Sequence, residues 1–266
     1  MNHNFRFELS FKNIDQLENK LNFCKFNKIT NINIPCKGII KKELFNSTFE
    51  YIKNNHKDLN VVFHYSLYHQ YSKNKENSYN ELLNFIHKCN RYEQFNILLV
   101  SGSIKKKEFD VINVLNKLKN KKDLTMKFGI AYNPYLNKYY NSLSERDSYE
   151  IKISSGVVSS IWLQYGTDIK LLENEVKFIR ENDKYKEKNL FGSLLIPSKQ
   201  FLARFKFRPW KEVYIANKYL YSLNDFYAFT RDLLNFYLKN KITPVVETDF
   251  YSSKKLDILY SFLKNN

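Results

Sequence analysis

Glycine, proline and cysteine are scarce in this chain of 266 residues, which has six Gly, five Pro and three Cys. So few glycines and prolines argue against a loop-dominated or fibrous chain. Cys24, Cys36 and Cys89 form neither a C-x-x-C pair nor an even set, which favours buried thiols in a reducing compartment over a disulfide framework. Apolar residues still make up 43% of the chain, which is enough for a sizeable core and excludes a disordered protein.

Long hydrophobic runs are also absent. No apolar run approaches the 18 residues of a membrane-spanning helix, and Met1–Arg6 lacks the apolar stretch of a signal peptide. We therefore expect one domain over residues 1–266 that is soluble and cytoplasmic, or organellar if a leader has been removed, with no membrane partner.

Several common catalytic motifs are missing from the sequence. It has no H-E-x-x-H, no Walker Gly-Lys motif, no G-x-G-x-x-G and no G-x-S-x-G. His64 and His69 are five residues apart, which is poor spacing for metal ligands, so no metal site is predicted.

The chain is strongly basic: 43 Lys and Arg against 27 Asp and Glu give a net charge of +16. Its 36 lysines and 33 asparagines are spread along the whole chain, as codon bias in an AT-rich genome would produce. This spread favours a solvated surface over a nucleic-acid groove, so RNA binding is the less favoured alternative. The same charge should attract anionic small ligands, such as nucleotides or polyglutamylated cofactors.

Short apolar runs rich in β-branched and aromatic residues recur along the chain and predict eight strands. These strands are Phe5–Leu9, Ile29–Ile34, Asn60–Tyr65, Asn96–Val100, Met126–Tyr132, Ser160–Gln164, Leu190–Ile196 and Ile242–Glu247. Segments with helical spacing lie between them: Asn13–Phe26, Ser78–Cys89, Phe109–Leu118, Asp168–Arg180, Leu223–Leu238 and Lys254–Leu263. Four of these helices have a polar residue as expected cap: Asn13, Ser78, Asp168 and Ser253. Repeated strand-then-helix units require parallel strands, and eight units of this length predict an α/β fold, a single (β/α)8 TIM-type barrel.

Turn-forming residues follow the predicted strands, as the βα loops of a barrel require. They are Pro35, Gly102, Pro134, Gly166 and Pro197. Polar side chains also stand at the strand ends: Glu8, Asn33, His64, Ser101, Asn133, Gln164, Ser198 with Gln200, and Glu247. In a barrel these ends meet at one mouth, where a small-molecule site forms. Taken singly, Glu8, His64 and Gln164 also fit structural roles in a barrel core.

Motifs at these positions run in the order of a known family. Phe7-Glu8-Leu9 resembles a Phe-Glu-Phe strand, His64-Tyr65-Ser66 resembles His-Leu-Thr, and Ile161–Tyr165 resembles Ile-Thr-Gln-Phe. Further matches are Ile32–Ile34 with Val-Thr-Tyr, Ser101–Ser103 after an apolar strand with Arg-Gly-Asp, Gly129–Pro134 with Val-Ala-Ala-Tyr-Pro, Lys152 and Gly156 with a Lys-x-x-x-Gly helix end, and Lys199-Gln200 with Phe-Lys-Gln. In these motifs the chain resembles the methylenetetrahydrofolate reductase family, whose members are flavin-dependent (β/α)8 barrels.

The resemblance implies an oxidoreductase of one-carbon metabolism and methionine biosynthesis that uses FAD, with NAD(P)H as electron donor and a folate as substrate. Glu8 would be the general acid that protonates the folate ring nitrogen, and Gln164 and Gln200 would contact the substrate. The residues that would bind the flavin are Asn33, His64, Ser101, Gly102, Ser103, Asn133 and Lys152.

Three of these positions depart from the family pattern. Ser101 and Ser103 replace the Arg and Asp of Arg-Gly-Asp, and Asn133 replaces the Tyr before the Pro. The departures motivate an alternative, a barrel without flavin that binds a pterin- or nucleotide-like ligand. The sequence leaves open whether the chain forms a homo-oligomer.

Overall fold

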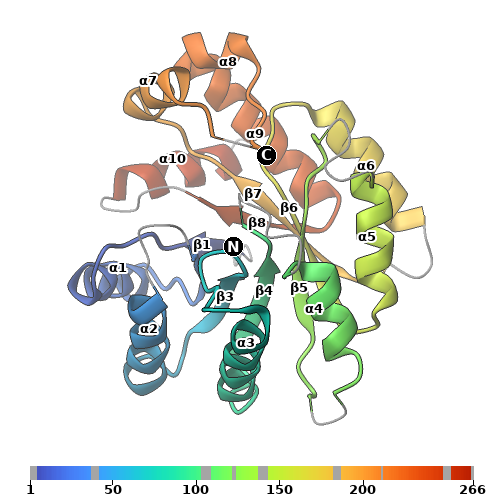
Figure 1. The fold of residues 1–266 in the computed structure, drawn as a ribbon. Helices are drawn as coiled ribbons and strands as arrows, with labels where there is room; N and C mark the ends of the chain where they lie inside the picture. Colours follow the sequence, from blue (N-terminus) through green and yellow to red (C-terminus); the bar gives the residue numbers. More distant parts are fainter. Residues whose placement is uncertain are drawn as a thin grey trace. The chain divides into compact units, whose positions relative to one another are not determined.

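The computed structural model describes residues 5–36, 42–102, 109–121, 124–136, 143–181, 187–210, 212–247 and 253–264. Eight strands form a closed barrel in the order of the sequence, from β1 to β8 (Figure 1). The strands are β1 (Arg6–Glu8), β2 (Asn31–Ile34), β3 (Asn60–Ser66), β4 (Phe95–Val100), β5 (Phe128–Tyr132), β6 (Val158–Leu163), β7 (Asn189–Leu194) and β8 (Ile242–Val246). Each overlaps a strand expected from the sequence, so the predicted (β/α)8 TIM-type barrel is confirmed.

Helices follow the strands along the chain. They are α1 (Ile14–Phe26), α2 (Lys42–Asn55), α3 (Lys75–Cys89), α4 (Val111–Leu118), α5 (Glu145–Ser154), α6 (Ile169–Glu181), α7 (Lys199–Phe207), α8 (Asn217–Tyr221), α9 (Leu223–Lys239) and α10 (Ser253–Lys264). The six helices expected from apolar spacing are all present. The spacing analysis did not predict α2, α5, α7 or α8.

Two of the four expected helix caps are confirmed. The side chains of Asn13 and Asp168 accept hydrogen bonds from the backbone N–H groups of Gln16 and Leu171. The prediction for Ser78 is wrong, because α3 begins three residues earlier and Asn74 is its cap. The first turn of α3 is polar, so the apolar spacing did not reveal it. α10 begins at Ser253, whose side chain lies outside the described part.

The chain divides into two compact units. The N-terminal unit consists of residues 6–131 and 146–160, and the C-terminal unit of residues 1–5, 132–145 and 161–266. Each unit is described separately below. The expectation of one domain over residues 1–266 stays a prediction.

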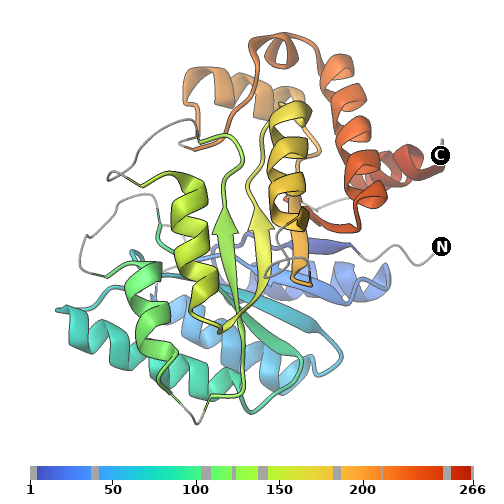
Figure 2. The ribbon, with the colours of Figure 1, turned by 90° about the vertical axis from the view of Figure 1, so that its right-hand side faces the viewer.

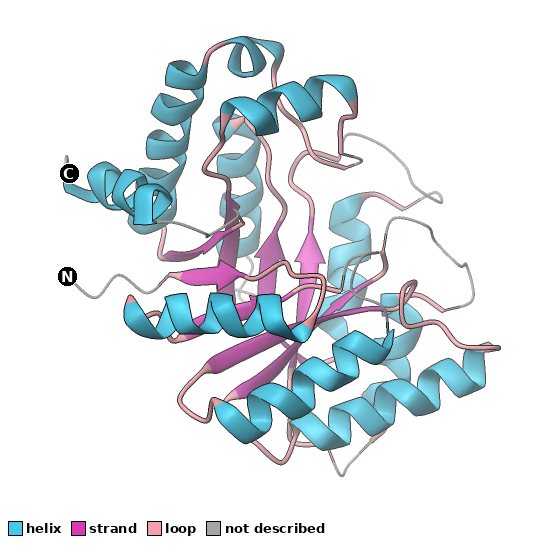
Figure 3. Ribbon diagram, turned by 90° about the vertical axis from the view of Figure 1, so that its left-hand side faces the viewer, coloured by secondary structure: helices cyan, strands magenta, loops and turns pink. Residues whose placement is uncertain are grey.

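In the N-terminal unit, β1 to β5 pair in parallel, with Glu8 opposite Asn33 in β2 and Asn33 opposite Val62 in β3. Figures 1 and 2 show α4 next to α5. Figure 3 distinguishes the helices, in cyan, from the strands, in magenta. Phe63 from β3 lies in contact with Phe45 of α2 and Phe85 of α3, with ring centroids 5.7 and 5.6 Å apart. Burial of these aromatic rings attaches α2 and α3 to the sheet.

In the C-terminal unit, β7 and β8 pair in parallel over five residues, and α9 packs against both strands. The indole of Trp162 in β6 stacks on Phe191 in β7, with ring centroids 4.1 Å apart. Among the described residues, no helix is long and apolar enough to cross a membrane.

The loops after the strands begin where the sequence predicted. β2 ends at Ile34, β4 at Val100 and β7 at Leu194, and the expected turn residues Pro35, Gly102 and Pro197 follow within three residues. Pro134 and Gly166 likewise follow β5 and β6. The polar strand ends of the sequence analysis therefore lie at the carboxyl ends of real strands, which is where (β/α)8 barrels form their sites.

Candidate functional site

Three of the predicted site residues come together in the N-terminal unit. Glu8 ends β1, Asn33 lies in β2 between the two other strands, and His64 lies in β3. The Oε2 atom of Glu8 is 3.6 Å from Nδ1 of His64, and both side chains are largely buried. A buried carboxyl next to an imidazole is an arrangement that can hold or transfer a proton.

Asn33 joins His64 to a fourth residue. Its amide Nδ2 lies 3.0 Å from His64 Nε2, and its Oδ1 accepts a hydrogen bond of 2.7 Å from Nε of Arg6. Asn33 is completely buried, so both ends of its amide are occupied inside the protein. We call Arg6, Glu8, Asn33 and His64 the polar core cluster.

Arg6 was missed by the sequence analysis. Its Nη1 donates to Asn60 Oδ1 at 3.2 Å, and its Nη2 donates to the backbone carbonyls of Ile32 and Asn60 at 2.7 and 2.8 Å. Burial lowers the pKa of Arg6 to about 10, so the guanidinium is still cationic at neutral pH. In the described part of the chain Arg6 forms no ion pair, and its bonds go to neutral carbonyl oxygens. Its position two residues before Glu8 was the available signal, because alternate residues of a strand share one face.

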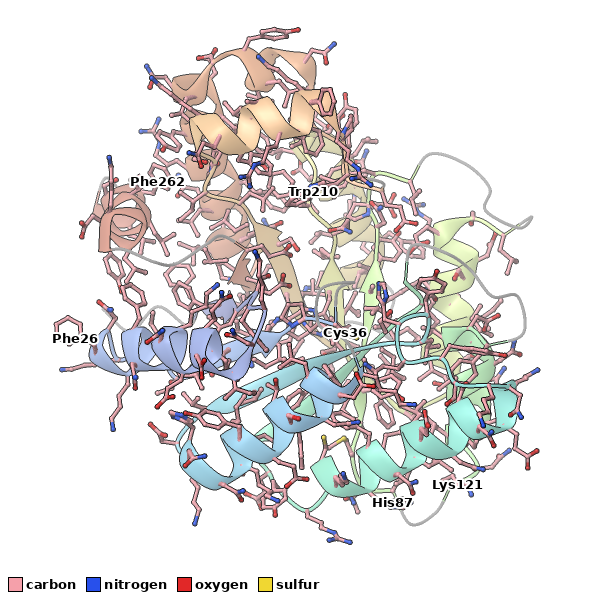
Figure 4. All side chains as sticks on the ribbon, turned by 60° about the vertical axis from the view of Figure 1, so that its left-hand side comes forward. Phe26, Cys36, His87, Lys121, Trp210 and Phe262 are labelled. Carbon is pink, nitrogen blue, oxygen red and sulfur yellow. The ribbon has the colours of Figure 1, made fainter. Side chains whose placement is uncertain are left out.

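A second buried group follows β2 and β3. The amide of Gln70 donates to the thiol of Cys36 at 3.1 Å, and both side chains are buried. Burial raises the pKa of the Cys36 thiol. Figure 4 shows Cys36 inside the protein, whereas Phe26 at the end of α1 points outward. All three cysteines are free and buried, as the sequence predicted.

Ser101 and Gly102 form a tight turn after β4. The carbonyl of Ser101 accepts from the backbone N–H of Tyr68, and Gly102 has a φ of +86°. A Cβ on Gly102 would lie 2.6 Å from Cβ of Tyr68. The glycine is therefore needed for close packing of two loops. Ser103, the third residue of this motif, lies outside the described residues.

Lys152 lies in the last turn of α5 and is half-buried. The helix ends two residues later, and Gly156 follows with a φ of +76°. The helix end expected at this motif is thus present in the structure.

In the C-terminal unit, Asn133 holds the loop after β5. Its Nδ2 donates to the carbonyl of Glu212 at 2.8 Å, and its Oδ1 accepts from the backbone N–H of Tyr135 at 3.0 Å. Its own backbone N–H donates to Oε1 of Glu145 at 3.1 Å. These bonds use both ends of the Asn133 side-chain amide within this unit.

The two predicted substrate contacts also lie in the C-terminal unit. Gln164 follows β6, is half-buried, and its Oε1 accepts from the backbone N–H of Tyr165 at 3.0 Å. Gln200 lies in the first turn of α7 and is exposed. Ser198 caps that helix by accepting from the backbone N–H of Phe201.

Glu247, at the end of β8, accepts a hydrogen bond from the hydroxyl of Ser193 in β7. The hydroxyl of Tyr237 in turn donates to the carbonyl of Ser193 at 3.0 Å. The hydroxyls of Tyr135 and Tyr165 are buried and have no hydrogen-bond partner among the described residues. Burial raises the pKa of Tyr165 well above its ordinary value.

The flavin contacts implied by the family resemblance do not fit this arrangement. Asn33 and Asn133 use their side-chain amides for bonds within the protein, and Gly102 is packed against Tyr68. These three of the implied flavin contacts are therefore engaged within the protein, and FAD binding through the others stays a prediction. No group of three or more His, Cys, Asp and Glu side chains that could hold a metal ion occurs in the described ranges.

No protein-family model matches the chain, and no curated protein matches its sequence. Solved structures match its fold. The active domain 2 of a chitinase from Pyrococcus furiosus, in a structure of catalytic site mutants, is 10% identical, covers 98% of this chain and 95% of its own, and has a TM-score of 0.57. HPPK-DHPS from Plasmodium falciparum, solved with SDX-DHP, is 14% identical with a TM-score of 0.53, and the match covers all of this chain but 47% of that one. At these identities the likeness shows the barrel fold alone.

Proposed function

We propose that this chain binds a folate-type ligand and protonates its pterin ring through Glu8, as in a methylenetetrahydrofolate reductase-like barrel. The observation that carries the proposal is the buried contact of Glu8 with His64, 3.6 Å apart, near the carboxyl ends of β1 and β3, the two strands on either side of β2. Both residues stand in motifs that resemble that family. The solved structures of similar fold do not select a substrate, so the choice of folate depends on these residues.

Glu8 has the surroundings that an acid catalyst requires. It is buried in the polar core cluster, within reach of the imidazole of His64. Burial takes a carboxyl group out of water, and loss of water favours its neutral, protonated form. Protonation of a pterin ring nitrogen makes the attached methylene carbon electrophilic, which is the step that general acid catalysis would supply here.

The complete reductase reaction is the second candidate function, favoured by the order of the family-like motifs along the chain. It would need FAD to carry hydride from NAD(P)H to the folate, and such chemistry belongs to the cofactor. Because Asn33, Gly102 and Asn133 are engaged within the protein, the proposal covers folate binding and proton transfer only. A flavin absorbance band in the purified protein would favour the full reductase.

The test is titration of the purified protein with a reduced folate, followed by assay of methylenetetrahydrofolate with NAD(P)H in the presence and absence of added FAD. Glu8→Gln should bind folate with unchanged affinity, because Gln keeps the shape. Turnover should fall by about 10²-fold or more, the usual effect of removing a general acid. Glu76→Gln makes the same substitution at an exposed position on α3 of the same unit and should change neither quantity.

Two results would contradict the proposal. Absence of folate binding by the folded protein would exclude a folate site, and near-normal turnover of Glu8→Gln would exclude Glu8 as the acid. RNA binding that weakens steeply with salt, without any folate binding, would instead favour a role for the basic surface.

A further inference from the structure

The polar core cluster has a fixed direction of hydrogen bonding that starts at Arg6. A guanidinium can only donate hydrogen bonds. The atom of Asn33 that lies 2.7 Å from Arg6 Nε must therefore be the carbonyl oxygen, Oδ1. Two further donor groups of Arg6 are bonded to carbonyl oxygens of Ile32 and Asn60, which hold the guanidinium in place.

This orientation decides the chemistry at the other end of the amide. With Oδ1 facing Arg6, the Nδ2 group of Asn33 faces His64 and can only donate. His64 Nε2, 3.0 Å away, must then accept and cannot carry a proton. In a neutral imidazole whose Nε2 is an acceptor, the proton is on Nδ1, which is the nitrogen facing Glu8.

We propose that Arg6, acting through Asn33, locks His64 in its neutral Nδ1–H form. Arg6 and Asn33 are positioning residues in this scheme. With Nδ1 already protonated and Nε2 occupied, His64 cannot take up a proton from Glu8. Proton transfer from Glu8 to His64 is therefore prevented, so a proton on Glu8 can pass to the ligand and not to the imidazole. This last consequence depends on the proposed function, whereas the state of His64 does not.

These hydrogen bonds also account for a buried cation in β1 that has no carboxylate partner in the described part of the chain. A paired acid would accept from the guanidinium in place of the Asn33 carbonyl and would leave the amide free to rotate. Neutral carbonyl oxygens at Ile32 and Asn60 hold Arg6 and leave its Nε directed at Asn33.

The test is ¹⁵N NMR of the full chain with labelled histidine, in which long-range ¹H–¹⁵N correlations distinguish the two neutral tautomers and the imidazolium. The chain has five histidines, and loss of one signal set in His64→Gln assigns His64. The wild-type protein at neutral pH should show the Nδ1–H form. An Nε2–H form or an imidazolium at His64 would overturn the proposal without any variant.

Asn33→Asp reverses the direction of the hydrogen bond with little change of shape. Its carboxylate still accepts from Arg6, and toward His64 it can act only as an acceptor, so Nε2 should become protonated. Asn60→Asp places the same charge against the same guanidinium, but at Nη1 in place of Nε, and it should leave the tautomer unchanged. An unchanged tautomer in Asn33→Asp, or the same change in both variants, would refute the lock.

Enzyme assay separates this inference from the proposed function. Where folate turnover is measurable, Asn33→Asp should lower kcat by about 10²-fold, because Glu8 would lose its proton, with little effect on KM. If His64 is in the Nδ1–H form in the wild type and in the Nε2–H form in Asn33→Asp, but no folate binds, the inference about His64 is supported and the folate assignment fails. If folate is turned over but His64 is an imidazolium, the lock fails and the folate assignment stands.

Discussion

Tyr237 of α9 lies over Gly192 of β7 so closely that a Cβ on this glycine would be 2.4 Å from the tyrosine ring. The Tyr237 hydroxyl donates to the carbonyl of Ser193 at 3.0 Å. Tyr165 is also fully buried in the C-terminal unit, but its hydroxyl has no partner within the described ranges. The two phenols thus have similar burial and differ in hydrogen bonding.

This difference predicts opposite effects of removing each hydroxyl. Tyr165→Phe should raise the free energy of unfolding by about 1 kcal/mol, because an unpaired buried hydroxyl costs free energy. Tyr237→Phe should lower it by about 1 kcal/mol, because the carbonyl of Ser193 loses a donor. Urea denaturation of the two variants measures both changes. Equal losses of stability in the two variants would show that the Tyr165 hydroxyl has a partner in solution.

The fold was largely predictable because each strand is a short apolar run that stands apart from its neighbours. β3 shows this well, since Val61, Phe63 and Tyr65 alternate with residues of the opposite face. α2 was not predicted, although the sequence contains the signal for it. Its buried residues have helical spacing: Phe45, Thr48, Phe49 and Ile52. α8 has five residues and one buried side chain, Leu220, so it gave almost no periodic signal.

The site was predictable only in its residue types. Glu8, Asn33 and His64 could be placed near one another because their strands are neighbours in a barrel. The sequence could not reveal that the Asn33 amide is fully used by Arg6 and His64, because the direction of a hydrogen bond depends on side-chain placement. The same limit applies to Asn133, which a family motif assigned to the flavin but which the structure shows bonded within its own loop region.

Gly102 and Gly156 both have positive φ and provide a matched pair for testing close packing. A Cβ at Gly156 would meet no atom within 4 Å, whereas one at Gly102 would clash with Tyr68. Gly156→Ala should therefore cost about 1 kcal/mol, from backbone strain alone. Gly102→Ala should cost about 2–4 kcal/mol, because overpacking adds to that strain. Thermal or urea unfolding gives both values, and similar costs would mean that the loops can separate at Gly102.

Asn133→Ala tests whether this residue holds its loop or contacts a flavin. Loss of the bonds to the Glu212 carbonyl and the Tyr135 amide should lower stability by about 2 kcal/mol. Asn174→Ala, at an exposed position on α6, should stay within about 0.5 kcal/mol of the wild type. The measurement is urea unfolding combined with flavin titration. Unchanged stability together with weaker flavin binding in Asn133→Ala would show that Asn133 contacts a flavin and does not hold the loop.

Stability should fall in alkaline solution because of the buried thiols. Burial raises the pKa of Cys24 from 9.0 to about 12. Between these values the unfolded chain has lost the thiol proton while the folded chain still holds it. Unfolding then releases a proton, so the free energy of unfolding decreases as pH rises, by about 1.4 kcal/mol per pH unit for each such thiol. This thiol does not lower the free energy of unfolding below pH 9. Its effect grows as pH rises and stops growing near pH 12, where the folded chain also loses the thiol proton.

Cys24→Ala isolates this contribution, because alanine does not titrate. Urea denaturation under reducing conditions at pH 8, 9, 10 and 11 should give a shallower decline for Cys24→Ala than for the wild type, by about 1.4 kcal/mol per pH unit above pH 9. Burial also raises the pKa of the Cys89 thiol, so Cys89→Ala should show the same shallower decline. In the double variant, the difference from the wild-type slope should be twice as large. Parallel declines in the wild type and Cys24→Ala would mean that the Cys24 thiol ionises in the folded protein as readily as in the unfolded chain.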